Sequence, residues 1–182
     1  MKKHTVTVFG SARGNETADL LATSYKLGGL IAEAGWVLCN GGYGGTMEAA
    51  ARGAAEKGGD IVAVTVESFQ REPNPYSSKV ISRSRLLERL ESLLELGDAF
   101  VVLPGGTGTL LEIAAVLEFQ NKGMFQMKPM ILYSDYWRQY FDSIKDILCK
   151  VNKSKTLELL YLATATEEII EIIRTFFHDT LE

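Results

Sequence analysis

Short apolar runs that end abruptly in glycine constrain the fold of this chain most. Such runs occupy residues 5–9, 36–39 and 99–103, and glycine clusters follow them at residues 10–14, 41–45 and 105–108. Longer stretches with apolar side chains at helical spacing separate the runs. Apolar runs of this length are typical of parallel strands buried on both faces and joined by crossover helices. The pattern predicts an α/β fold, an open doubly wound and mostly parallel sheet with helices on both faces, which is the Rossmann-like class.

The remaining segments extend this alternation along the whole chain. Strands are expected at residues 5–9, 36–39, 61–66, 99–103, 130–133 and 160–163. Helices are expected at residues 17–34, 46–57, 82–96, 110–121, 136–150 and 167–177. Residues 67–78 contain two of the prolines and are interpreted as an irregular surface loop. Because no repeat or low-complexity segment interrupts the pattern, we expect one domain over residues 1–182.

The composition of the chain excludes several classes of protein. The 182 residues carry 19 basic and 23 acidic side chains, and 46% are hydrophobic, which excludes a disordered chain. With a formal charge of −4, the chain has no overall positive field that would attract a polyanion, so we expect no nucleic-acid partner. With no secretory signal and no apolar run near the ~20 residues of a membrane span, we expect a cytoplasmic protein with no membrane partner. Cys39 and Cys149 are interpreted as buried apolar residues, and no metal site is expected.

The glycine clusters are also the candidate ligand site. In an open α/β sheet the carboxyl ends of the strands line the ligand crevice. Glycine lets backbone N–H groups approach a ligand, and a helix that starts after such a turn attracts phosphate. A single cluster could be only a tight turn, but three at one edge favour binding. Neither GxxxxGK[ST] nor GxGxxG is present, which disfavours an ordinary nucleotide loop. The candidate binding residues are Gly10, Ser11, Gly41, Gly42, Gly44, Gly45, Gly105, Gly106, Thr107, Gly108 and Thr109.

The third cluster resembles the signature of a known family. Residues 104–112 read Pro-Gly-Gly-Thr-Gly-Thr-Leu-Leu-Glu, similar to the PGGxGTxxE signature of the LONELY GUY (LOG) family. Residues 8–11 and 41–48 are similar to the family's first two glycine loops, and the resemblance covers most of the chain. It implies a Rossmann-like homodimer that hydrolyses the N-glycosidic bond of nucleoside 5′-monophosphates, AMP and cytokinin ribotides included, to a free base and ribose 5-phosphate. No cofactor is expected.

The resemblance also assigns a catalytic pair. It places the family's catalytic arginine on Arg89 and its catalytic glutamate on Glu112. The family has a lysine after that arginine, whereas Leu90 stands here, and Thr46-Met47-Glu48 replaces the Leu-Met-Gly of the second glycine loop. Leu90 keeps a second function open, a non-catalytic carrier of the same fold that binds a nucleotide or a pterin-type cofactor. A weaker alternative is an interaction protein whose crevice is vestigial.

The two catalytic candidates also have purely structural alternatives. Glu112 follows Thr109 by three residues near an expected helix start, which is the spacing of a capping box. Arg89 follows Arg85 by four residues, so both could face the crevice or lie on a solvated helix face among glutamates. Leu86, Leu90 and Leu93 have the spacing of a buried stripe.

The helices at residues 82–96 and 110–121 are the expected dimer contacts.

Overall fold

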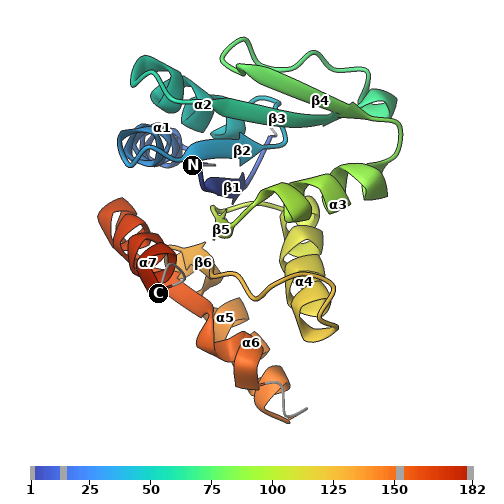
Figure 1. Cartoon of the computed structure of the whole chain (residues 1–182), viewed down its shortest axis with the longest axis vertical. Helices are drawn as coiled ribbons and strands as arrows, with labels where there is room; N and C mark the ends of the chain where they lie inside the picture. The colour runs from blue at the N-terminus through green and yellow to red at the C-terminus, as the bar shows by residue number, and fades with distance from the viewer. Residues whose placement is uncertain (1–2, 13–15, 151–153, 180–182) are drawn as a thin grey trace.

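The chain forms one parallel β-sheet with helices on both faces. The computed structural model describes residues 3–12, 16–150 and 154–179. Within them, a seven-stranded sheet has the order β4-β3-β2-β1-β5-β6-β7, with every neighbouring pair parallel (Figure 1). The strands are β1 (Thr5–Phe9), β2 (Val37–Asn40), β3 (Ile61–Val66), β4 (Lys79–Arg83), β5 (Ala99–Val102), β6 (Met130–Tyr133) and β7 (Leu160–Ala163). The α/β, Rossmann-like prediction is confirmed.

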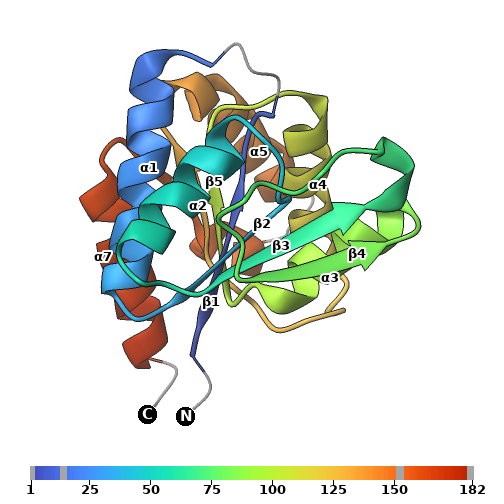
Figure 2. The same ribbon diagram turned by 90° about the horizontal axis from the view of Figure 1, so that it is seen from above.

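Helices connect these strands and cover the sheet. They are α1 (Ala18–Glu33), α2 (Thr46–Glu56), α3 (Leu86–Leu96), α4 (Thr107–Asn121), α5 (Arg138–Lys150), α6 (Ser154–Glu158) and α7 (Thr166–Asp179), with the short 3-10 turns η1 (Glu67–Phe69) and η2 (Asp135–Trp137). Figure 2 shows α1, α2 and α7 on one side of the sheet and α3, α4 and α5 on the other. This two-sided cover explains why the strands are continuously apolar.

Alternate residues of the central strands supply two separate cores. Val6 and Val8 of β1 point to the face covered by α1, α2 and α7, where they join the apolar side chains of those helices. Phe9 points to the opposite face and packs with residues of α3, α4 and α5. The rings of Phe9 and Phe100 stack on that second face with centroids 5.8 Å apart. Burial on both faces holds the central strands, and thus the loops that follow them, in fixed positions.

The centre of the sheet is the point where the winding reverses. β1 pairs with β2 on one side and with β5 on the other. Phe9 lies opposite Val102, so β1 and β5 end level with each other. The Leu103 N–H donates to the Phe9 carbonyl at 2.9 Å, which continues the pairing to the start of the loops. Ligands of open α/β sheets bind at such a reversal, beside the carboxyl ends of the two strands.

The sequence missed one strand and misplaced two helix starts. Residues 79–83, which lie between the expected loop at 67–78 and the expected helix at 82–96 and overlap the start of that helix, form edge strand β4 paired with β3. Helix α3 consequently begins at Leu86 instead of residue 82, and α4 begins at Thr107 instead of residue 110. Most of β4 is exposed, so it lacks the apolar pattern of the other strands.

Four further expectations concern single residues or properties. Cys39 is buried in β2 as expected, but Cys149 is exposed on α5, because its neighbour Leu148 lies on the buried face of that helix. Positions 13 and 14 of the first glycine cluster lie outside the described residues. In the part of the chain that the structure describes, no helix is long and apolar enough to cross a bilayer. The same residues contain no group of three His, Cys, Asp or Glu side chains arranged for a metal ion.

Candidate active site

A pocket of about 260 Å³ opens at the carboxyl ends of β1 and β5. The first and second glycine loops form two of its walls, and the beginning of α4 forms a third. Helix α3 contributes Arg89, and the second turn of α4 contributes Glu112. The expected site residues that line this pocket are Gly10, Ser11, Gly41, Arg89, Gly106, Thr107, Gly108, Thr109 and Glu112. The structure thus brings both catalytic candidates and parts of all three glycine loops into one cavity.

The other expected binding residues lie behind this pocket or beside it. Gly42 and Gly45 have positive φ angles of 76° and 65°, so they set the path of the second glycine loop. Gly44 follows the same loop and does not line the pocket. Gly105 borders an adjacent hollow, where its carbonyl accepts a hydrogen bond from the Tyr136 hydroxyl at 2.8 Å. These four glycines shape the loops around the cavity.

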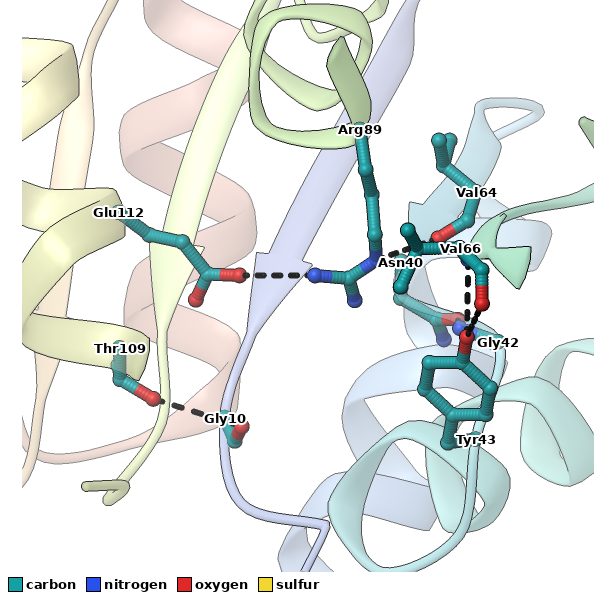
Figure 3. A network of polar contacts seen from close by, with 9 residues as sticks. All are labelled: Gly10, Asn40, Gly42, Tyr43, Val64, Val66, Arg89, Thr109 and Glu112. Atoms are coloured by element: carbon teal, nitrogen blue, oxygen red, sulfur yellow. Dashed lines mark hydrogen bonds and ion pairs between the residues drawn. The ribbon is translucent and has the colours of Figure 1, made fainter. Parts of the chain in front are cut away.

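The beginning of α4 faces the pocket without a side-chain cap. Gly106 is the N-cap residue, and within the described part of the chain this position makes no side-chain capping hydrogen bond. The alternative of a capping box between Thr109 and Glu112 is wrong, because the helix already starts at Thr107. The Thr109 hydroxyl instead donates to the Gly10 carbonyl at 3.4 Å and ties the first loop to the third (Figure 3). A helix start of this kind is suited to an anionic group.

Arg89 is held by contacts on several sides. It is 8% exposed, and its Nε donates to the Val64 carbonyl of β3 at 2.7 Å. Its guanidinium carbon lies 5.7 Å from the centre of the Tyr43 ring, and its Nη1 lies 4.0 Å from Glu112 Oε1 (Figure 3). A Cβ atom at Gly41 would lie 1.8 Å from Arg89 Nη2, so only glycine fits beside the guanidinium. The arginine is therefore fixed in the cavity, and the solvated-face alternative is wrong.

The neighbours of Arg89 on α3 have different positions. Arg85 is the exposed N-cap residue of this helix and does not line the pocket, so the expectation that both arginines could face the crevice is wrong. Leu90 is 7% exposed and Leu93 is fully buried, as the stripe predicts, and Leu90 also lines the cavity. Leu86 is 41% exposed at the pocket, because α3 begins only at this residue.

Burial gives Glu112 an unusual charge state. Its side chain is 13% exposed and faces Arg89 across the cavity. Burial raises the pKa of Glu112 from 4.5 to about 7, and the positive charge of Arg89 opposes that rise. A carboxyl group with this pKa exchanges protons near neutral pH, which is suited to acid–base chemistry.

Two residues that support the second glycine loop were not predicted from the sequence. The Tyr43 hydroxyl accepts a hydrogen bond from the Val66 N–H at 2.9 Å and donates to the Val66 carbonyl at 3.2 Å. The Asn40 side chain accepts from the Gly42 N–H at 2.8 Å and donates to the Met47 carbonyl at 3.0 Å. An asparagine two residues before a turn position is a known turn signal, so Asn40 could have been found from the sequence.

Two further lining residues come from the segment expected to be a surface loop. Phe69 and Arg71 both line the pocket, although they follow β3 and precede β4. Their segment packs against the second glycine loop, where the Asn74 N–H donates to the Gly42 carbonyl at 2.7 Å. Nothing in the local sequence pattern indicates this contact, because it depends on the pairing of β4 with β3.

Comparisons with known proteins agree with this architecture. Residues 3–169 match the family model described as the SLOG cluster4 family. An uncharacterized protein of Archaeoglobus fulgidus is 36% identical over 132 residues, which cover 72% of this chain and 85% of that protein. A cytokinin riboside 5′-monophosphate phosphoribohydrolase of Rhodococcoides fascians is 32% identical over 146 residues, which cover 77% of this chain and 73% of the relative.

A solved structure extends the likeness to nearly the whole chain. The molybdenum cofactor binding protein of the phototrophic bacterium Rippkaea orientalis superposes with a TM-score of 0.78 at 26% sequence identity. The match covers 97% of this chain and 99% of that one. With the PGGxGTxxE signature at the start of α4, these likenesses confirm the resemblance found in the sequence. The chain belongs to the SLOG cluster4 family and is a LOG-like protein with a Rossmann-like fold.

Proposed function

We propose that this protein hydrolyses the N-glycosidic bond of a nucleoside 5′-monophosphate, of the AMP or cytokinin ribotide type, to a free base and ribose 5-phosphate. The observation that carries the proposal is the pair of Arg89 and Glu112, which face each other across a pocket that also contains the start of α4. Relatives named as phosphoribohydrolases, such as that of Rhodococcoides fascians, support the same reaction.

The chemistry of the pocket walls is suited to the parts of such a ligand. The uncapped N–H groups at residues 106–109 would hold the phosphate. Across the cavity, side chains that are aromatic or apolar offer a surface for a flat base: Val8, Tyr43, Met47, Phe69, Leu86, Leu90 and Leu111. The ribose would then lie between these surfaces, within reach of Glu112. In this arrangement the glycosidic bond would lie beside the buried carboxyl group of Glu112.

The proposed reaction uses the ionised form of Glu112. Positive charge develops on the anomeric carbon as the bond to the base breaks, and a nearby carboxylate stabilises that charge. Water adds its hydroxyl group to the anomeric carbon, the bonding electrons leave with the base, and the remaining water proton ends on the base. The Arg89 charge favours the ionised carboxylate and opposes the effect of burial. Glu112 would also orient the attacking water.

A second candidate function is binding without turnover. Leu90 contributes an apolar side chain to the pocket at the position where the LOG family has a lysine after its catalytic arginine. The Rippkaea orientalis relative is named as a molybdenum cofactor binding protein, and its fold extends over nearly all of this chain. A carrier would hold a nucleotide or a pterin-type cofactor in the same pocket and release it unchanged.

We further propose a homodimer whose contacts lie near the pocket. Three leucines on α3 and α4 are exposed to solvent. Leu86 is 41% accessible, Leu87 is 64% accessible and Leu111 is 43% accessible. Large apolar side chains grouped beside a cavity favour a protein contact over solvent. A second copy of the chain would cover them through α3 and α4.

Incubation with AMP tests the proposed reaction. Free adenine, separated by chromatography, is the expected product, with ribose 5-phosphate in equal amount. Adenosine is the matched control, because it has the same glycosidic bond without the phosphate, and we expect little release from it. AMP that binds and is recovered intact would favour the carrier function.

A further inference from the structure

The charge balance of the pocket leaves one cation without a partner among the described residues. The charged side chains that line the cavity are Arg71, Arg89 and Glu112. Arg89 faces Glu112 and donates to the Val64 carbonyl, so its charge is already engaged. Arg71 is exposed and has no hydrogen bond or ion pair with any residue that the structure describes. The pocket therefore has an available positive charge at its edge.

The backbone at Gln70 adopts a conformation that is uncommon for a residue other than glycine. Its φ of 49° and ψ of 40° lie in the left-handed region. Its N–H donates to the Glu67 carbonyl at 3.1 Å and closes the η1 turn. The residues on both sides of Gln70, Phe69 and Arg71, line the same pocket. Such strain is retained where surrounding structure imposes it, and it is common at ligand-binding positions.

Phe69 places an aromatic ring at the pocket. It is 44% exposed, and its ring centre lies 5.8 Å from that of Tyr43. Tyr43 is itself 4% exposed and anchored through its hydroxyl to Val66. One ring is therefore fixed and the other stands half-exposed beside it. A flat ligand ring can gain contact with such a pair.

We propose that residues 69–71 form a recognition turn, in which Arg71 gives the anionic group of the ligand a contact in addition to the start of α4, and Phe69 covers its flat ring. The inference rests on the proposed function, because it names the contacts that select a nucleotide for the same pocket. It assigns binding contacts to a segment that carries neither the glycine signature nor the catalytic pair. The ligand class that it selects combines a planar ring with a phosphate.

Calorimetric binding of AMP and of ribose 5-phosphate separates the two contacts. Arg71→Gln should weaken both ligands about tenfold or more, because each loses a charge-assisted hydrogen bond to its phosphate. Phe69→Ala should weaken AMP about fivefold and leave ribose 5-phosphate unchanged, because only AMP has a ring to cover. Both side chains are exposed, so both variants should keep the melting temperature of the wild type.

Arg85→Gln is the matched control, since Arg85 is an exposed arginine at the start of α3 that does not line the pocket. It should bind both ligands like the wild type. Equal AMP affinity in the wild type and Arg71→Gln, or an equal loss in Arg85→Gln, would overturn the recognition turn and leave the proposed function standing. A wild type that binds neither ligand would overturn both.

Discussion

At the scale of single residues, the position of Arg89 and the charge state of Glu112 depend on how completely the fold surrounds them. The Val64 carbonyl, the Tyr43 ring and the backbone at Gly41 fix the guanidinium. Glu112 has no comparable set of donors among the described residues, and burial therefore dominates its pKa. Only the family resemblance predicted that these two residues would face each other in one site. Their burial could not be predicted, because it depends on side chains from β2, β3 and the second glycine loop.

The raised pKa of Glu112 predicts a specific dependence of stability on pH. The native state keeps this proton between pH 4.5 and about 7, whereas the unfolded chain has already lost it. Raising the pH through this range should therefore lower the free energy of unfolding, by up to about 3 kcal/mol from this group, with no further loss from it above pH 7. Urea denaturation of the wild type and of Glu112→Gln at pH 5 and pH 8 measures this change in the free energy of unfolding.

Glutamine has no proton to lose in this range. The free energy of unfolding of Glu112→Gln, relative to that of the wild type, should therefore be higher at pH 8 than at pH 5 by a similar amount. A stability difference between the two proteins that stays the same at both pH values would contradict the assignment.

Gly41 predicts a second effect at the residue scale. An alanine there would place its Cβ 1.8 Å from Arg89 Nη2, so Gly41→Ala should displace the guanidinium. We expect AMP turnover to fall about tenfold or more, the range for a displaced charge-stabilising group. Gly44→Ala in the same loop is the control, because its Cβ would meet only Glu48 Oε2, at an ordinary 3.7 Å. Similar activity in the two variants would show that the position of Arg89 is unimportant.

At the scale of elements, the site depends on where the loops leave the sheet. The level ends of β1 and β5 bring the first and third glycine loops together, and the Thr109 hydroxyl joins them. The sequence predicted these strands well, because buried parallel strands are continuously apolar. It misplaced the start of α4 because Gly106 and Gly108 resemble a longer turn, and it missed β4 because an edge strand does not need apolar residues.

The uncapped start of α4 predicts that ligand binding depends on phosphate. AMP should raise the melting temperature, and adenosine should raise it much less, because adenosine offers no anion to the helix N–H groups. At a hundredfold excess over Kd, binding to the native state stabilises it by about 2.7 kcal/mol. Differential scanning fluorimetry with the two ligands measures the contrast. Equal shifts would mean that α4 does not hold the phosphate.

At the scale of the whole molecule, two of the exposed leucines of α3 and α4, Leu86 and Leu111, line the pocket, so the proposed dimer contact would adjoin the proposed active site. The proposed dimer predicts a particle of twice the 20.1 kDa of one chain in light scattering at micromolar concentration. Leu87→Glu should yield monomers, because a charge would be buried at the contact. Ile147→Glu is the control, because Ile147 is 59% exposed on α5 instead. A monomeric wild type would refute the dimer.

The central claim is that Glu112 acts on the glycosidic bond, and Glu112→Gln tests it most directly. Adenine release from AMP and calorimetric AMP binding are measured side by side in the variant and the wild type. Glutamine keeps the size of the side chain but removes the negative charge. We therefore predict a fall of about 10²-fold or more in kcat with AMP affinity retained, because the proposed phosphate contacts at the start of α4 are unchanged. Adenine release that is equal in the two proteins would contradict the account.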